Sequence, residues 1–273
     1  MRGNQRRRVL IQTVCSLLFL LAVCAAGYLC RDRASMADFT AVNLKPCLPH
    51  PFGTDWMGRD MFARTMRGLS ISMFLGMLAA AVSAAAALLL GTCSVLLGSR
   101  ADRLVGFLID LVMGIPHMLL LILISVACNR GFAGVCAGIA LTHWPSLTRV
   151  IRAEVMQLRD SIYIQTAAKL GKGRLYIVCR HMLPHLASQF LVGLILLFPH
   201  AILHESSITF LGFGLSSEQP AIGIVLSESM KYLVTGKWWL AFFPGLFLMM
   251  TVMMFYTAGE NIRRLADPGS VHE

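Results

Sequence analysis

Histidines within apolar stretches are the residues of this sequence best suited to metal chemistry. His200 and His204 stand four positions apart in one such stretch, so a helix would present both on the same face. His143 lies in another stretch, beside Trp144. A pair of imidazoles on one face can ligate a transition metal, which makes His200 and His204 candidate metal ligands. A histidine inside a helical bundle also serves as an interhelical hydrogen-bond donor, and the sequence leaves both roles open.

Two acids and a proline also interrupt the apolar stretches. Asp110 follows Arg103 by seven residues, so its carboxylate either reaches the membrane interface or faces a polar pathway. Pro116 removes a backbone hydrogen bond and is expected to kink its helix where protein or water satisfies the freed carbonyl. The candidate residues of a translocation path are therefore Asp110, Pro116, His143, His200, His204 and Glu205.

Catalysis by this chain is not expected. His204, Glu205 and Ser206 would have to form any hydrolytic site, but neighbours on one helix point about 100° apart and do not converge. The phosphate-binding pattern G-x-x-x-x-G-K-[ST] does not occur, because residues 171–174 lack both its spacing and its hydroxyl residue. We therefore expect no cofactor on this chain and ATP hydrolysis by other subunits.

The elements that must position these residues are apolar helices. Of the 273 residues, 56% are hydrophobic and 14% are charged, whereas soluble domains carry about a quarter charged residues. Several apolar runs reach the roughly 20 residues that a helix needs to cross a bilayer. The net charge of +10 comes from Lys and Arg residues that stand between these runs. This spacing fits membrane topology and does not indicate nucleic-acid binding.

The predicted fold is all-α: a polytopic membrane protein with six transmembrane helices. The predicted spans are Val9–Tyr28, Ser70–Gly98, Leu104–Cys128, Gly131–Leu147, Leu186–Ile208 and Trp238–Ala258. Small residues of the run 79–87 would let neighbouring helices approach the second span closely, which makes it an interior helix. We expect residues 1–68 to hold a cytoplasmic tail, the first helix and an extracellular or periplasmic segment. Residues 69–265 would then form a five-helix core, and residues 266–273 a C-terminal tail.

Basic residues indicate the orientation, because Lys and Arg collect in loops on the cytoplasmic side. With the N-terminus inside, fifteen of the 24 Lys and Arg residues lie on that side, seven of them between residues 149 and 180. Both termini are therefore predicted to be cytoplasmic. The first apolar run is longer than a cleavable signal core, so we expect it to remain as a helix. Cys30 and Cys47 fall on the outer side, where a disulfide between them is an open alternative.

The cytoplasmic loop 152–184 carries the most distinctive pattern. Tyr163 to Gly171 reads Tyr-Ile-Gln-Thr-Ala-Ala-Lys-Leu-Gly, and Leu183-Pro184 follows a dozen residues later, which predicts two short helices around a glycine. The pattern resembles the EAA loop of ABC importer permeases. The resemblance implies a coupling loop that docks on an ATPase subunit, formed by Gln165, Thr166, Ala167, Ala168, Gly171, Leu183 and Pro184. Gln165 and Thr166 stand where that family usually has Glu and Ala, so hydrogen bonds are expected in place of a charge contact.

Further motifs resemble, in their order along the chain, the dipeptide, oligopeptide and nickel permease family. They are residues 53–60 (Gly-Thr-Asp-Trp-Met-Gly-Arg-Asp), Asp110 with Ile115-Pro116, residues 209–214 (Thr-Phe-Leu-Gly-Phe-Gly), residues 243–245 (Phe-Pro-Gly) and Asp267-Pro268. Each string alone is weak, but their order and separation are specific. The chain resembles a C-type permease subunit of a bacterial cell membrane. The resemblance implies, as partners, a B-type permease, two ABC ATPase subunits, an extracellular or periplasmic substrate-binding protein and membrane lipids.

The expected function is that of a permease forming half of the translocation pathway of an ABC importer. Residues 142–144 (Thr-His-Trp) and 200–204 (His-Ala-Ile-Leu-His) resemble the nickel-type branch of the family. The expected cargo is therefore nickel or another metal chelate, or a di- or oligopeptide. A proton- or ion-driven secondary transporter is the alternative function, although only Asp110 and Glu205 offer buried acids for it.

Overall fold

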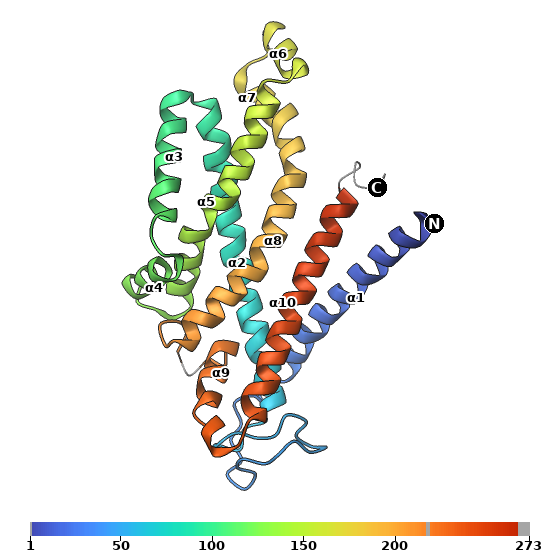
Figure 1. The fold of residues 1–273 in the computed structure, drawn as a ribbon, viewed down its shortest axis with the longest axis vertical. Helices are drawn as coiled ribbons and strands as arrows, with labels where there is room; N and C mark the ends of the chain where they lie inside the picture. The colour runs from blue at the N-terminus through green and yellow to red at the C-terminus, as the bar shows by residue number, and fades with distance from the viewer. Residues whose placement is uncertain (1, 217–218, 267–273) are drawn as a thin grey trace.

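The computed structural model describes residues 2–216 and 219–266, which form an elongated bundle of helices (Figure 1). The long helices are α1 (Arg2–Leu29), α2 (Met61–Leu96), α3 (Ser99–Met113), α4 (His117–Ala127), α5 (Gly131–Arg159), α8 (Leu183–Phe210) and α10 (Trp239–Ala266). The short elements are α6 (Ile162–Lys169), α7 (Arg174–Ile177), a π-helical turn (Val178–Met182), α9 (Ile222–Met230) and a 3-10 turn (Leu233–Thr235). The part of the chain that the structure describes has no strand beyond a single bridge between Thr54 and Asp60, which confirms the all-α prediction.

Helix α2 is the centre of the bundle. Its start is fixed by the carboxylate of Asp60, which accepts a hydrogen bond from the backbone N–H of Ala63 at 2.8 Å. It packs against α1, α5, α8 and α9. Ala79, Ala84 and Ala87 are all 0% exposed, because their small side chains let the neighbouring helices approach closely. The prediction that the second span is an interior helix is confirmed.

The third predicted span is two helices. Helix α3 ends at Met113, α4 begins at His117, and the two axes differ by 94°. Pro116 at the break has an extended ψ of 120°, which no helix can continue through. The sequence predicted a kink here, and the structure makes it a full change of direction. Helix α3 is held to α5 by the guanidinium of Arg152, whose two hydrogen bonds to Asp102 (2.5 and 2.6 Å) raise its pKa.

Membrane crossing is supported for most of the long helices. Four of them, α1, α2, α8 and α10, have the length and apolarity of a span, and the bent pair α3 and α4 makes a fifth when its halves are counted together. Helix α5 has 29 residues but does not meet the same criterion, because polar residues such as Thr142, His143 and Ser146 lower the apolarity of its uncharged first half. The count of six spans therefore stays a prediction. The sequence did not predict α9, since nine residues are too few to stand out as a span.

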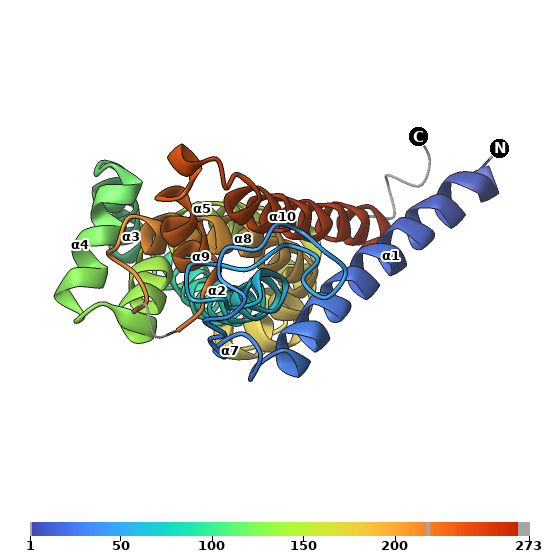
Figure 2. The same cartoon turned by 90° about the horizontal axis from the view of Figure 1, so that it is seen from below.

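The two ends of the bundle differ in structure. Residues 30–60 form an irregular segment that lies across the ends of α2 and α10, as seen from below in Figure 2. Phe52 of this segment stacks on Phe243 of α10, with ring centroids 4.7 Å apart. Cys30 and Cys47 are free thiols, so the disulfide that the sequence left open is not formed. The start of α1 and the end of α10 point away from this segment, toward the half of the molecule that holds α6, and lie about halfway along its length (Figure 1). Residues 267–273, which include Asp267-Pro268 and most of the predicted tail, lie outside the described residues.

Candidate functional site

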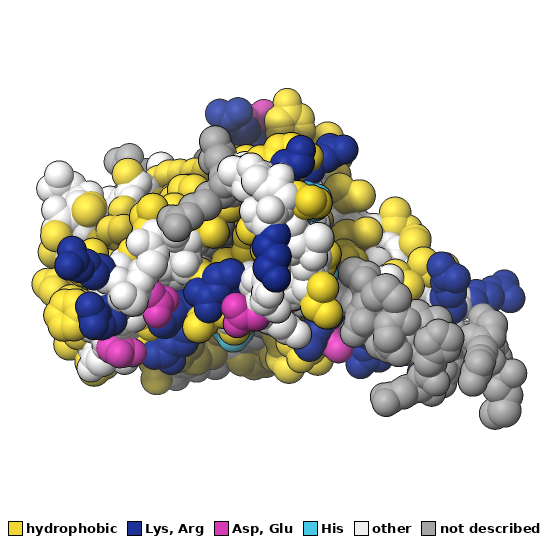
Figure 3. Space-filling model, turned by 90° about the horizontal axis from the view of Figure 1, so that it is seen from above, with side chains coloured by type: hydrophobic (Ala, Val, Ile, Leu, Met, Phe, Trp, Pro, Cys, Tyr) yellow, Lys and Arg dark blue, Asp and Glu magenta, His cyan; other side chains and the backbone are white. Residues whose placement is uncertain are grey.

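Helix α6 lies at one extreme of the molecule, beyond the ends of α5 and α8 (Figure 1). The side chain of Ile164 is buried and attaches α6 to the bundle, whereas Ile162 is 84% exposed. Lys and Arg side chains are spread over this end of the molecule (Figure 3), and Lys169 and Lys172 are exposed there. The loop thus presents a mixed apolar and basic surface.

Gly171 ends α6 and turns the chain back toward the bundle. Its φ of +78° is a left-handed conformation that other residues adopt only at a cost. Its N–H donates to the carbonyl of Ala168, and the N–H of Lys172 donates to the carbonyl of Ala167, so the last carbonyls of α6 are satisfied. The sequence-predicted pair of short helices around a glycine is therefore present as α6 and α7.

The remaining coupling-loop residues divide between holding α6 together and joining it to α8. Thr166 Oγ1 donates to the carbonyl of Ile162 (2.8 Å), and Gln165 Nε2 donates to the carbonyl of Asp160 (3.1 Å). Ala167 packs against the core, whereas Ala168 is exposed. Leu183 and Pro184 open α8, where a proline in the first turn costs no hydrogen bond. The structure therefore keeps the predicted coupling residues in one continuous loop.

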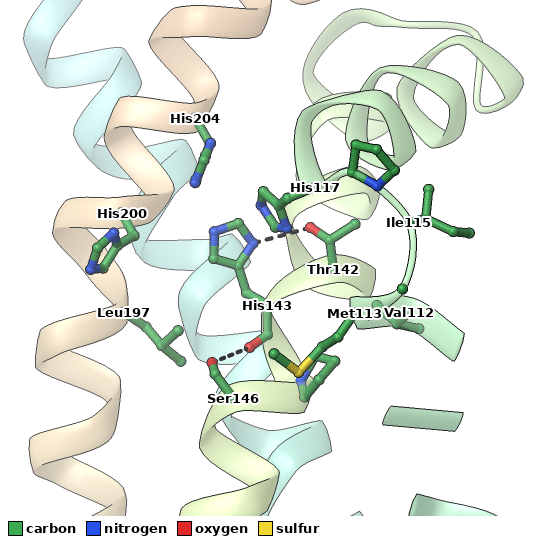
Figure 4. Close-up of a pocket in the computed structure, with 13 residues that line it drawn as sticks. Val112, Met113, Ile115, His117, Thr142, His143, Ser146, Leu197, His200 and His204 are labelled. Atoms are coloured by element: carbon green, nitrogen blue, oxygen red, sulfur yellow. Dashed lines mark hydrogen bonds between the residues drawn. The ribbon is translucent and has the colours of Figure 1, made fainter. Parts of the chain in front are cut away.

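A cavity of about 650 Å³ lies between the break of α3 and α4 on one side and α5 and α8 on the other (Figure 4). Its lining residues are Val112, Met113, Gly114, Ile115, Pro116, His117, Thr142, His143, Pro145, Ser146, Leu197, His200 and His204. Met113 and Ile115 are exposed, so the cavity sits at the margin of the bundle rather than in its core.

Three imidazoles from three helices meet in this cavity. His117 comes from α4, His143 from α5 and His204 from α8. Their ring centroids lie 4.7 Å (His117 to His143), 4.5 Å (His117 to His204) and 5.1 Å (His143 to His204) apart. One ligating nitrogen from each can be chosen so that all three nitrogens are within 4.8 Å of one another. We call these three residues the histidine triad.

The triad differs from the pair expected from sequence. His200 lines the same cavity one turn from His204, but it is not one of the three histidines whose nitrogens converge (Figure 4). His117 was not among the predicted residues. It is far from His143 and His204 in the sequence, and only the break at Pro116 turns it toward them. The one sequence feature that could have indicated His117 as a cavity residue is its position directly after Pro116, where the helix breaks.

The two predicted acids lie outside the cavity lining. Asp110 is an exposed residue of α3 whose carboxylate pairs with Arg149 of α5 at 2.9 Å, so it ties two helices together. Glu205 is 0% exposed and faces away from His204, because successive residues on a helix point about 100° apart. Its carboxylate accepts hydrogen bonds from Thr209 (3.0 Å) and Ser206 (3.3 Å). Of the predicted path residues, Pro116, His143, His200 and His204 line the cavity.

Comparison with known proteins identifies the family. The model of the "Binding-protein-dependent transport system inner membrane component" family matches residues 72–269, which is more than half of the chain. The dipeptide transport system permease protein DppC of Bacillus subtilis is 30% identical, over 92% of this chain and 79% of its own length. The oligopeptide transport system permease protein OppC of the same organism is 28% identical over 98% of this chain and 88% of its own. The probable D,D-dipeptide transport system permease protein DdpC of Escherichia coli is 30% identical over 92% of this chain and 84% of its own length.

These matches confirm the resemblance drawn from the coupling loop and the other motifs. Relatives over most of the chain are permease subunits of ABC importers, which are transport components of the cell membrane and not enzymes themselves. The protein belongs to the family of binding-protein-dependent transport system inner membrane components, as a non-catalytic permease of an ABC importer.

Proposed function

We propose that this chain forms one half of the translocation pathway of a bacterial ABC importer and transmits the movement of an ATPase subunit to the cavity. The observation that carries the proposal is the continuity of the loop with the cavity walls. Helix α5 ends next to α6 and contributes His143 to the cavity, and α8 begins after the loop and contributes His204. A displacement of α6 therefore acts on both helices that line the path.

Prolines within both helices give this displacement a place to act. Pro145 lies inside α5 and lines the cavity, and Pro199 lies inside α8 directly before His200, which lines it. A proline in a helix interior removes one backbone hydrogen bond and bends the helix more easily at that point. Each helix can thus move its loop end relative to its cavity end, which suits a pathway that alternates between two accesses.

The partners follow from the shape of the cavity and the surface around it. The cavity is open at the margin of the bundle, and the adjoining helices carry exposed apolar side chains such as Leu119 (59%) and Leu123 (64%). We propose that a B-type permease closes the pathway and that lipid covers the rest. Two ATPase subunits would dock at the loop ends of the two permeases, and a substrate-binding protein at the opposite end.

We propose six membrane spans, of which α5 is the most polar. We also propose that the end of the molecule that carries α6 lies in the cytoplasm. A span that lines a path is expected to be less apolar than one that faces lipid, which accounts for Thr142 and His143 in α5. The start of α1 and the end of α10 lie toward α6, so both termini would be cytoplasmic as well (Figure 1).

The names of the relatives support a cargo of small-peptide size. Those relatives carry dipeptides or oligopeptides according to their descriptions, and the candidate cargo of this chain is a di- or oligopeptide or a metal chelate. Family membership argues against the ion-driven alternative, since the family depends on binding proteins.

Substitution of Gly171 by proline tests the coupling function. Proline fixes φ near −65° and lacks the N–H that Gly171 donates to Ala168, so the turn after α6 cannot form. We expect uptake of labelled dipeptide or nickel by cells to fall at least about tenfold, while the purified complex still hydrolyses ATP. Gly173→Ala is the matched control, because a Cβ at Gly173 meets no atom within 4 Å among the described residues. Uptake by Gly171→Pro at the level of Gly173→Ala would remove the coupling assignment.

A further inference from the structure

The histidine triad consists of one buried and two half-buried imidazoles, and transmission of movement does not require it. We propose that His117, His143 and His204 bind one divalent first-row transition metal ion, which the importer carries either free or in a chelate with open coordination positions. This inference rests on the proposed import function and names the class of its cargo.

The geometry of the triad fits a shared ion. Imidazole nitrogens lie about 2.0–2.1 Å from a bound metal, so ligands in a tetrahedral arrangement are roughly 3.4 Å apart. The three nitrogens already lie within 4.8 Å of one another, and side-chain rotation closes the difference. The rings stand at 55–80° to one another, so no two of them are stacked face to face.

The hydrogen bonds of His143 leave one nitrogen free for a metal. Its Nδ1 lies 3.0 Å from the carbonyl of Ile139 and donates to it, which fixes the tautomer in which Nε2 carries the lone pair. Metal-ligating histidines commonly donate their other ring nitrogen to a backbone carbonyl in this way. The Nε2 atom of His143 is buried and has no hydrogen-bond partner among the described residues.

Each of the other two imidazoles also has a ring nitrogen available to an ion. His117 Nε2 is also buried without a hydrogen-bond partner in the described part of the chain. His204 Nδ1 lies 3.1 Å from the Met118 sulfur, which leaves its Nε2 as the free nitrogen. The unpaired Nε2 atoms of His117 and His143 are buried, and a buried polar atom without a partner costs free energy. Ligation of an ion satisfies them.

The lining selects the kind of ion. No Asp or Glu is among the described residues that line the cavity, so hard cations such as Ca²⁺ and Mg²⁺ lack their preferred oxygen ligands. Imidazole nitrogens favour Ni²⁺, Co²⁺, Cu²⁺ and Zn²⁺. Three protein ligands leave further coordination positions open, and a cavity of about 650 Å³ has room for a small chelator that fills them.

The position of the triad links binding to the transport cycle. The two helices next to the coupling loop, α5 and α8, carry His143 and His204, while α4 carries His117. Movement of α5 and α8 relative to α4 separates the three nitrogens and weakens coordination. The ion is therefore held in the arrangement seen here and released when the helices move apart.

Cobalt titration of the full chain, purified with its copurifying subunits in lipid nanodiscs through a tag without histidine, tests the site. We expect one Co²⁺ per chain, with ligand-field absorption bands of nitrogen coordination. His117→Gln, His143→Gln and His204→Gln should each weaken Co²⁺ binding at least about tenfold. His200→Ala is the matched variant, because His200 lines the same cavity outside the triad, and it should change the affinity less than about threefold.

Three results would overturn the site: absence of nitrogen-coordinated Co²⁺ in the wild type, unchanged affinity in the triad variants, or equal losses in His200→Ala. Thermal unfolding of each variant shows whether it is folded, and the spectrum of bound Co²⁺ in the wild type tests the ligands independently of any variant. Failure of the site and failure of the import function are separable. Wild-type uptake by Gly171→Pro removes the function alone, whereas dipeptide uptake by a chain that binds no Co²⁺ removes the metal site alone.

Discussion

Arg64 lies near the start of α2 and is 2% exposed, so its positive charge is buried in the core. Its guanidinium donates to Asp55 at 2.6 Å and to Glu228 of α9 at 2.9 Å. Arg59 contacts the same two carboxylates, at 2.7 and 3.2 Å. The four side chains join the irregular segment 30–60, α2 and α9 into one charged cluster, which is neutral because two positive and two negative groups pair within it.

Removal of one carboxylate from this cluster should destabilise the protein strongly. In Asp55→Asn the buried guanidinium of Arg64 loses its nearest negative charge, and such a loss costs about 3–5 kcal/mol. We expect Tm to fall by roughly 10 °C in a thermal unfolding experiment. Asp160→Asn is the control, because Asp160 and Arg159 form an exposed pair (69% and 50%) outside the predicted spans that contributes less than about 1 kcal/mol. Equal Tm changes in the two variants would contradict the structural role of the cluster.

At the scale of elements, the close packing of α4 on α5 sets the position of His117. A Cβ added to Gly134 of α5 would lie 2.7 Å from the carbonyl oxygen of Ser125 of α4, which is too close for any real contact. The two helices therefore touch through their backbones. The break at Pro116 sets the direction of α4. The absence of a side chain at Gly134 sets how closely α4 approaches α5.

Gly134→Ala should push α4 away from α5. Overpacking of this kind costs about 1–3 kcal/mol, and we expect a lower Tm together with weaker Co²⁺ binding, because His117 moves with α4. Gly106→Ala in α3 is the control, since its Cβ would lie at an ordinary 3.8 Å from Arg152. Co²⁺ affinity and Tm at wild-type values in Gly134→Ala would show that α4 does not depend on this contact.

The sequence predicted those elements that depend on a short, continuous stretch of residues. Apolar runs of about 20 residues gave the long helices, and Gly171 gave the turn between α6 and α7. Pro116 predicted a kink but not its size. The angle of 94° between α3 and α4 depends on the packing of α4 against its neighbours, which is not a local property of the sequence. The coupling role of the loop stays a prediction.

The triad could not be predicted because its members share no spacing. His200 and His204 are neighbours on a helix face, and this local regularity suggested a pair. His117 joins His143 and His204 only through the packing of α4, α5 and α8, which is a tertiary property. Glu205 was a reasonable path residue by type, but its face of α8 turns to the core, where Thr209 and Ser206 satisfy it.

At the scale of the whole molecule, the two ends of the bundle should face different compartments. The basic surface near α6 suits the cytoplasm, and the irregular segment 30–60 suits the outside (Figures 1 and 3). Two native thiols report on this directly, because Cys47 in the outer segment and Cys179 in the coupling loop are both exposed.

Labelling of intact cells with a membrane-impermeant maleimide tests the orientation. In a variant that keeps only Cys47, we expect labelling without permeabilisation. A variant that keeps only Cys179 should be labelled only after the membrane is opened. The reverse pattern would invert the orientation and place the coupling loop out of reach of any ATPase.

The charged cluster at Arg64 also constrains how the protein is made. After Arg64 the ribosome adds 164 residues to reach Glu228, which takes roughly 10–30 s at about 5–20 residues per second. During that interval the nascent chain holds two arginines against the single carboxylate of Asp55. A polypeptide truncated before α9 keeps that surplus positive charge, because Glu228 is the second carboxylate that pairs with Arg59 and Arg64.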